Sequence, residues 1–220
     1  MTPSGKALAA QAITTEVRAA RRHQRNIPVL TTERLTLRAP HHGDVRAITH
    51  LANDRRVAEN TLGVPHPYGN GDAEQFIAAV NWQDGEATFV VTRDGELIGI
   101  CSVAMREGTA EIGYWLGVPF WGAGYATETA RAVIDHAFAD LDYQALAAGA
   151  RVSNPASRRV LEKCGFQWNG VALYRIRAIN SAAPVDRFRL DRGLWASIKS
   201  WGQVKRRGQV KQGGQVKQMA

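Results

Sequence analysis

A glycine-rich turn, placed between strand-like and helix-like residues, is the part of this chain best suited to chemistry. Residues 111–128 read EIGYWLGVPFWGAGYATE. Such a turn can leave several backbone N–H groups unpaired and directed at one point, where the start of the next helix adds partial positive charge. Gly122 and Gly124 lack the Cβ atoms that would keep a phosphate oxygen away from the backbone. The segment therefore predicts a site for a phosphate-bearing ligand, and an ordinary glycine-rich connection is the alternative.

Two common nucleotide-binding motifs fit this turn less well. It begins like a dinucleotide-binding fingerprint, but Thr127 occupies the place of the third glycine. The residues before it read as antiparallel strands, whereas a dinucleotide-binding domain needs repeated strand–helix–strand units. No GxxxxGKS or GxxxxGKT run occurs in the sequence, which argues against a P-loop.

A second segment, NPASRRVLEKCGF at residues 154–166, carries the start and stop signals of a helix. Asn154 is suited to the N-cap, and Pro155 to the first helical position, where no N–H is needed. Lys163 falls near the negative end of the helix, and Gly165 suits the left-handed residue that follows it. By itself this pattern predicts a well-capped packing helix.

Taken together, the glycine turn, this helix and the strand-like residues 145–152 between them resemble the GNAT superfamily of acyl-CoA N-acyltransferases. The family's pyrophosphate-binding pattern, Gln/Arg-x-x-Gly-x-Gly/Ala, matches residues 121–126, with Trp121 in the first place. The run WGAGYATE, the Asn-x-x-Ser and Glu-Lys-x-Gly-Phe residues downstream, and TERLTLR at residues 32–38 are similar to the ribosomal-protein N-terminal acetyltransferases of the RimJ/RimL type. The likeness covers residues 30–196.

The resemblance implies a cofactor and the residues that bind it. The acyl donor is expected to be acetyl-CoA, with no metal. Its pyrophosphate is expected at the turn, its pantetheine arm along the backbone near Leu116 and Val118, and its thioester end near Asn154. The turn residues expected to bind are Trp121, Gly122, Ala123, Gly124, Tyr125, Ala126 and Thr127.

One position departs from the family pattern. Many GNAT enzymes carry a tyrosine seven residues after this asparagine, where it protonates the departing thiolate, and this chain has Leu161 there. Ser157 is the nearest hydroxyl that the resemblance offers in its place, so we expect it to be catalytic. Its alternative role is a local backbone hydrogen bond at the start of the helix.

The acceptor amine must be neutral when it attacks. At pH 7 an α-amino group with a pKa near 8 costs about 1.4 kcal/mol to deprotonate, whereas a lysine costs about 4.6 kcal/mol. A protein N-terminus therefore needs only a weak base or a water chain. Glu111, at the start of the strand that leads to the turn, is the candidate base, and a solvent-facing strand carboxylate is its alternative role.

Composition is typical of a cytoplasmic enzyme with one domain. The 220 residues are 45% hydrophobic, enough for one sizeable core. Cys101 and Cys164 are the two cysteines, which implies buried thiols rather than a disulfide framework. No apolar run approaches the roughly 20 residues that cross a membrane. The oligomeric state is left open between a monomer and a homodimer.

The net charge of +8 comes from the two ends of the chain. Residues 1–29 carry +4 and residues 198–220 carry +6, while residues 30–197, with 17 basic and 19 acidic residues, carry −2. We therefore expect a basic extension at 1–29, helical or disordered, an acetyltransferase domain at 30–197, and a disordered tail at 198–220 that repeats Gly-Gln-Val-Lys. Any nucleic-acid contact is expected through these tails, because the domain has no basic excess.

The elements that position the motifs predict an α+β domain with a central, mostly antiparallel sheet flanked by helices. Asp94-Gly95 predicts a tight hairpin turn, and Pro65, Pro67 and glycines predict a loop over residues 60–71. Strands are expected at residues 34–39, 87–92, 97–105, 110–116, 145–152, 166–174 and 185–190. Helices are expected at residues 44–53, 72–84, from 127 onwards, and from 155.

Other functions remain open at this point. The missing tyrosine allows a catalytically silent CoA-binding module, which turnover with a panel of amines would distinguish from an enzyme. The acceptor could be a small-molecule amine of the antibiotic or polyamine kind rather than a protein N-terminus. A nucleic-acid-associated protein acting through its tails would show salt-dependent binding that disappears when the tails are removed.

The tails are predicted to be dispensable for chemistry. A truncated chain of residues 27–198 should fold, bind acetyl-CoA and acetylate a small amine as well as the full chain does, because all the predicted motifs lie inside it. It should lose salt-sensitive association with acidic partners such as ribosomal RNA or a membrane surface. Loss of small-amine turnover with cofactor binding intact would mean that a tail forms part of the acceptor site, or that the boundary is misplaced.

Overall fold

The computed structural model describes residues 27–80, 85–106 and 108–200. Most of the predicted extension at 1–29 and of the predicted tail at 198–220 lies outside these residues. The division of the chain into an extension, a domain and a tail therefore stays a prediction. Described residues 192–200 are helical and run through the predicted domain boundary at 197.

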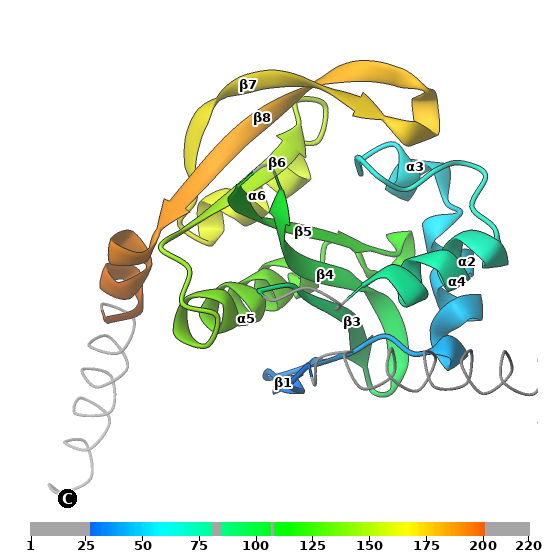
Figure 1. The fold of residues 1–220 in the computed structure, drawn as a ribbon, viewed down its shortest axis with the longest axis horizontal. Coiled ribbons are helices and arrows are strands. Elements are labelled where there is room, and N and C mark those ends of the chain that lie inside the picture. The colour runs from blue at the N-terminus through cyan, green and yellow to red at the C-terminus, as the bar shows by residue number, and fades with distance from the viewer. Residues whose placement is uncertain (1–26, 81–84, 107, 201–220) are drawn as a thin grey trace, which may run out of the picture.

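The described chain forms one sheet of eight strands in the order β1-β2-β3-β4-β5-β6-β8-β7 (Figure 1). All neighbours are antiparallel except β5 and β6, which are parallel. The strands are β1 Leu30–Thr31, β2 Thr36–Arg38, β3 Ala87–Arg93, β4 Glu96–Arg106, β5 Thr109–Leu116, β6 Ala145–Arg151, β7 Gln167–Ile176 and β8 Ser181–Asp191. The prediction of an α+β fold with a mostly antiparallel sheet is confirmed.

Helices lie on both faces of the sheet. The α-helices are α2 Val45–Ala52, α3 Arg55–Ala58, α4 Asn70–Ala79, α5 Tyr125–Ala139 and α6 Pro155–Lys163, and the short 3₁₀ helices are η1 His42–Asp44, η2 Val118–Phe120 and η3 Arg177–Ile179. β7 and β8 form a long, twisted pair at one end of the sheet, and α3 packs near their turn at η3 (Figure 1).

Local signals placed most elements correctly. The hairpin of β3 and β4 turns at Asp94 and Gly95, whose φ angles of 51° and 84° are the left-handed values that an Asp-Gly turn adopts. α5 begins two residues before the predicted start, at Tyr125. α4 begins at Asn70, inside the predicted loop, and ends at Ala79, while residues 81–84 of the predicted helix lie outside the described residues. The sequence analysis missed β1, α3 and the helical residues 192–200.

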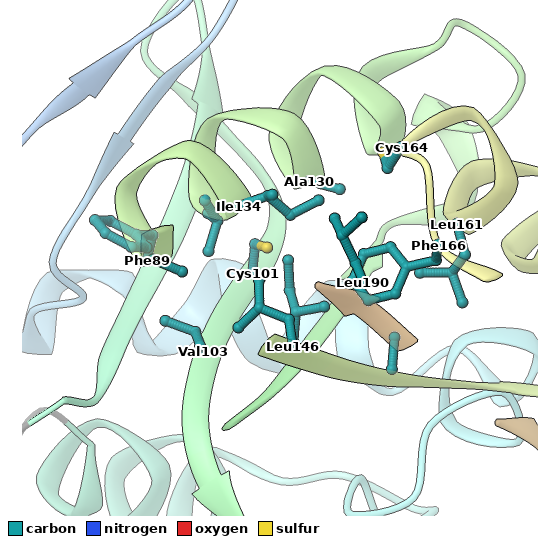
Figure 2. Packing of buried hydrophobic residues seen from close by; sticks show 14 of the residues in the cluster. Phe89, Cys101, Val103, Ala130, Ile134, Leu146, Leu161, Cys164, Phe166 and Leu190 are labelled. Carbon is teal, nitrogen blue, oxygen red and sulfur yellow. The ribbon is translucent and has the colours of Figure 1, made fainter. Parts of the chain in front are cut away.

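One face of the sheet packs against α5 and α6. Five apolar side chains at helical spacing on α5 are buried: Ala130, Val133, Ile134, Ala137 and Phe138. Figure 2 shows Ala130 and Ile134 of this helix above Cys101 of β4. Both cysteines are free and buried, as predicted.

The opposite face packs against α2 and α4 over the first half of the sheet only. Val45, Ile48 and Leu51 of α2 are buried against β3 and β4. Phe76 of α4 packs at the edge of the same cluster. Within residues 27–80, 85–106 and 108–200, no helix of this layer covers the face formed by β6, β8 and β7, which leaves room for a cavity described below.

The helical residues 192–200 are fastened to α5. Trp195 donates its indole N–H to Asp135 at 2.7 Å, and Lys199 forms an ion pair with the same carboxylate at 3.1 Å. A truncation that retains residue 200 therefore preserves this contact. Among the described residues, no helix is long and apolar enough to cross a membrane.

A buried ion pair joins β2 to the start of the α2 layer. The carboxylate of Asp44, 6% exposed, accepts two hydrogen bonds from the Arg38 guanidinium at 2.8 and 2.7 Å and one from the His41 backbone N–H at 2.8 Å. Burial raises the pKa of Asp44, but the bonds from Arg38 and His41 outweigh it, so the net pKa lies below its usual value.

We expect Asp44→Asn to lower the free energy of unfolding by about 2 kcal/mol at pH 7, because it leaves Arg38 without its anionic partner. Because the pKa of Asp44 is lower in the folded protein than in the unfolded chain, its ionised carboxylate stabilises the protein at pH values above about 3.9, the pKa of an unperturbed aspartate. This contribution of Asp44 to the free energy of unfolding is lost as the pH falls through the pKa that Asp44 has in the folded protein. Denaturant unfolding of the two proteins should therefore differ at pH 7 and converge below about pH 4. A difference that persists undiminished into acid would show that the charge of Asp44 is not the stabilising feature.

Candidate functional site

The parallel strands β5 and β6 separate shortly after they meet. They pair only at Glu111–Ala147 and Ile112–Ala148. Beyond this point β5 stays with β4 as far as Leu116, while β6 stays with β8 as far as Arg151. The two strands are thus held by different neighbours, and a cleft opens between Gly113 and Gly149. Two cavities border the cleft, and both touch these two glycines.

The first cavity, of about 410 Å³, lies on the side of the glycine turn and α6. Most of the predicted cofactor and catalytic residues border it: Leu116, Trp121, Gly122, Gly124, Tyr125, Ala126, Thr127, Asn154 and Ser157. Val118 and Ala123 do not border it, although both belong to the same turn. The structure thus brings together residues 40 positions apart around one cavity.

The turn has the backbone geometry predicted for an anion site. Gly122 and Gly124 have φ angles of 79° and 82°, and Gly124 is the left-handed residue before α5. In the described part of the chain, the five consecutive N–H groups of residues 122–126 donate no hydrogen bond; Thr127 is the first residue of the helix whose N–H does, to the Gly124 carbonyl at 3.1 Å. Five free donors at a helix start make a site for a phosphate.

Trp121 holds the turn in place. Its indole N–H donates to the carbonyl of Leu116 at 2.7 Å, which joins the turn to the last residue of β5. This donor is therefore engaged within the protein, and the backbone N–H groups are the ones free for an anion. The position that carries Gln or Arg in the family pattern thus shapes the site here.

Arg34 reaches the turn from outside, and the sequence analysis did not identify it. Its guanidinium binds Glu128 of α5 through Nε at 2.8 Å and Nη2 at 2.7 Å, and its Nη1 donates to the Ala123 carbonyl at 3.0 Å. Thr32 adds a 2.6 Å bond to Glu128. Burial raises the pKa of Glu128, but these bonds outweigh it and the net pKa is lowered. The TERLTLR segment contains both partners, but nothing in its sequence indicates where they bind.

Asn154 caps α6, as predicted. Its side-chain oxygen accepts the Ser157 backbone N–H at 3.1 Å. The cap places Ser157 at the third position of the helix, on the wall of the first cavity.

Ser157 shares its hydroxyl with Tyr114 of β5, which the sequence analysis also missed. The two hydroxyl oxygens are 3.0 Å apart, and either atom can donate; the Tyr114 hydroxyl also lies 3.2 Å from the Ser157 carbonyl. Burial raises the pKa of Tyr114 well above its usual value, so its phenol stays protonated and remains a donor at every working pH. Because side chains alternate along β5, Tyr114 lies on the face of this strand that packs toward the core. Its contact with α6 is evident only from the folded structure.

Leu161 is a core residue and does not border the cavity. Its side chain is fully buried, and Figure 2 shows it against Phe166 and next to Leu190. The usual tyrosine position is thus used for packing in this chain. The phenol nearest to Ser157 comes instead from the strand opposite the helix.

Glu111 lies on the other face of the sheet, where it borders a second cavity of about 470 Å³. Within residues that the structure describes, its carboxylate has no hydrogen bond or ion pair. β4, β5, β6 and β8 form the floor of this cavity, and residues 60–65 and α4 form its wall. Glu111 is therefore separate from Ser157 but next to the cleft through which the two cavities meet.

Among the described residues, no group of three or more His, Cys, Asp or Glu side chains is placed to hold a metal ion.

Comparison with known proteins gives a consistent result. A family model described as "Acetyltransferase (GNAT) domain" matches residues 34–167. An uncharacterized N-acetyltransferase, p20, of Bacillus licheniformis is 31% identical over 150 residues, which cover 64% of this chain and 84% of the relative. The ribosomal-protein-serine acetyltransferase of Escherichia coli is 34% identical over 85 residues, covering 37% of this chain and 48% of the relative. The crystal structure of spermidine N-acetyltransferase from Vibrio cholerae in complex with CoA and spermine aligns with a TM-score of 0.64 and 24% identity, covering 75% of this chain and 99% of that one.

The free N–H groups of the turn predict the effect of a side chain at Gly124. Gly124→Val should abolish measurable binding of acetyl-CoA, because a β-branched residue would block the phosphate and disfavour the positive φ angle. Gly95→Val is the matched control, since Gly95 has a similar φ of 84° and open space around it in a hairpin turn. Calorimetry should show the loss for Gly124→Val alone. Unchanged affinity in a folded Gly124→Val protein would rule out the turn as the phosphate site.

Proposed function

The chain belongs to the GNAT acetyltransferase family, and on that premise we propose that it transfers the acetyl group of acetyl-CoA to the α-amino group of a peptide or protein. Members of the family are acetyl-CoA-dependent N-acetyltransferases, and the fold and the sequence of this chain match them. The acceptor, the roles of individual residues and the domain boundaries at 30 and 197 are our proposals.

The observation that carries the proposal is the row of five free N–H groups at the start of α5. We assign the pyrophosphate of acetyl-CoA to these donors. The pantetheine arm would then follow β5 near Leu116 into the cleft beside β6, and the thioester would lie near Asn154 and Ser157. Backbone donors held in place in this way stabilise negative charge without having to reorganise.

The leaving thiolate is assigned to the hydroxyl pair. When the tetrahedral intermediate collapses, the carbon–sulfur bond breaks and the sulfur takes the electron pair. Ser157 donates a hydrogen bond to this sulfur while Tyr114 donates to the Ser157 oxygen, at the 3.0 Å separation that the structure gives. The two hydroxyls would thus do what the tyrosine of many family members does at the position where this chain has Leu161.

The incoming amine is assigned to the second cavity, beside Glu111. The amine nitrogen attacks the thioester carbonyl through the cleft at Gly113 and Gly149, and its surplus proton passes to the Glu111 carboxylate, directly or through a water molecule. An α-amino group suits a single carboxylate, because its neutral form costs about 3 kcal/mol less at pH 7 than that of a lysine.

We further propose the cytoplasm as the compartment, since both cysteines are buried free thiols. A monomer and a homodimer both accommodate a site built from one chain, and nucleic-acid contact is proposed only for the basic ends of the chain.

Removal of either hydroxyl should slow turnover without weakening cofactor binding. Ser157→Ala is expected to lower kcat by roughly 10- to 1,000-fold, and Tyr114→Phe by roughly 5- to 50-fold, with the KM for acetyl-CoA nearly unchanged. Tyr143→Phe is the control, because Tyr143 also donates a buried hydrogen bond, to the Gly85 carbonyl at 2.8 Å, but borders neither cavity of the site.

Steady-state kinetics with an amine panel, read by mass spectrometry, measures these effects and tests the function itself. A kcat within about threefold of the parent in Ser157→Ala would mean that the hydroxyl serves only its hydrogen bond to Tyr114 and that water protonates the thiolate. Tight binding of acetyl-CoA with no acetylated product from any amine would favour a silent CoA-binding module.

A further inference from the structure

The cavity beside Glu111 is basic, although the domain around it is slightly acidic. Residues 30–197 hold 17 basic and 19 acidic residues. Four arginines nevertheless border this one cavity, together with the two carboxylates of Asp72 and Glu111. We call Arg106, Arg151, Arg177 and Arg187 the acceptor arginines.

None of the acceptor arginines forms an ion pair with a described residue. Arg151 donates to the Glu59 carbonyl at 2.7 Å, while its Nε is buried with no partner. Arg187 lies over the ring of Tyr174, 5.2 Å from its centroid. Each guanidinium has five N–H donors, so these contacts leave most donors and the full positive charge available to a bound molecule.

The two carboxylates among the described residues of the cavity offset part of this charge and leave a surplus of two positive charges, four arginines against two carboxylates. Asp72 is committed to the start of α4, where its carboxylate accepts the Gly69 N–H at 2.9 Å. Burial raises the pKa of Tyr68 to about 12, so its phenol stays neutral. Glu111 is therefore the one carboxylate of this cavity that no described residue engages.

The acceptor arginines come from four separate elements. Arg106 ends β4, Arg151 ends β6, Arg187 lies within β8, and Arg177 begins η3. Arg106, Arg151 and Arg187 belong to strands that form the floor of the cavity, whereas Arg177 lies outside these strands. An extended chain with several anionic groups can therefore contact more of these guanidinium groups than a single small anion can. A polyamine would place its positive charges among these arginines at an electrostatic cost.

We propose that the acceptor is an acidic peptide segment, whose N-terminal amine reaches the cleft while Asp or Glu side chains at the following positions bind the acceptor arginines. This inference rests on the proposed function, because it assigns the amine to the cavity beside Glu111. The same charges that bind the peptide would also steer it toward the site at low salt.

The test compares acceptors that differ in charge alone. The panel is Ala-Asp-Glu-Asp-Gly-amide, its neutral counterpart Ala-Asn-Gln-Asn-Gly-amide, the basic peptide Ala-Lys-Lys-Lys-Gly-amide, spermidine, and O-phosphoethanolamine as a small amine that carries a phosphate. We expect kcat/KM for the acidic peptide to exceed that of the neutral one about tenfold or more, and the advantage to shrink as salt is added. Preference for spermidine or the basic peptide, or for the phosphate-bearing amine over the acidic peptide, would overturn the proposal.

Variants then connect the preference to the cavity. Arg106→Gln and Arg187→Gln should each lower kcat/KM for the acidic peptide about tenfold more than for the neutral peptide. Arg189→Gln is the control, since Arg189 also lies on β8 but pairs with Asp191 at 2.7 Å and does not border the cavity. Equal losses for both peptides, or the same loss in Arg189→Gln, would contradict the assignment.

A binding measurement separates this inference from the proposed function. Calorimetry of the peptides with the CoA-loaded protein reports charge preference without any transfer step. Preferential binding of the acidic peptide that Arg187→Gln weakens, without acetylated product, would support the basic acceptor site and reject the acetyl transfer. Acetylation of the acidic and neutral peptides at the same efficiency would keep the proposed function and reject the acidic acceptor.

Discussion

The site exists because the parallel strands β5 and β6 stop pairing after two positions. β5 is held by an antiparallel partner along its whole length, and so is β6, on its other side. After two paired positions the strands follow these separate neighbours, and the backbone edges that face the cleft have no strand partner there. Unpaired backbone polar groups in a sheet interior need a ligand or water to satisfy them, so the fold itself creates a demand for an extended polar guest.

The cleft also divides the chemistry between the two faces of the sheet. Alternation along β5 sends Tyr114 toward α6 and Glu111 toward the opposite face, so one strand supplies a hydroxyl to one cavity and a carboxylate to the other. Gly113 between them leaves the passage open, because it has no side chain to fill it. The period of two along the strand thus separates Tyr114, which we assign to the side of the leaving sulfur, from Glu111, which we assign to the amine, while the two residues are three positions apart.

Sequence reasoning succeeded where the signal was local. The cap of α6, the hairpin at Asp94, and the glycine turn before α5 are all encoded within a few residues of where they act, and each formed as predicted.

The missed features depend on residues that are far apart in the chain. Tyr114 and Ser157 are separated by 43 positions, and Arg34 and Glu128 by 94. The acceptor arginines lie between residues 106 and 187 and look like ordinary surface charges in the sequence. Leu161 is a further example. Many family members carry a tyrosine at this position, and the buried core around Leu161 explains why this chain carries an apolar residue instead. Roles for Glu111 and Ser157 stay predictions until turnover is measured.

The contact of Thr32 and Arg34 with Glu128 has a consequence for how the protein is made. Thr32 leaves the ribosome early, but its partner follows 96 residues later. Closing so long a loop is entropically costly and slow compared with forming a helix or hairpin. The hydrogen bonds from Thr32 and Arg34 to Glu128, at the start of α5, can therefore form only after the sheet strands between the two segments have been synthesised. A partly synthesised copy therefore lacks the contact that joins Thr32 and Arg34 to the turn to which we assign the pyrophosphate.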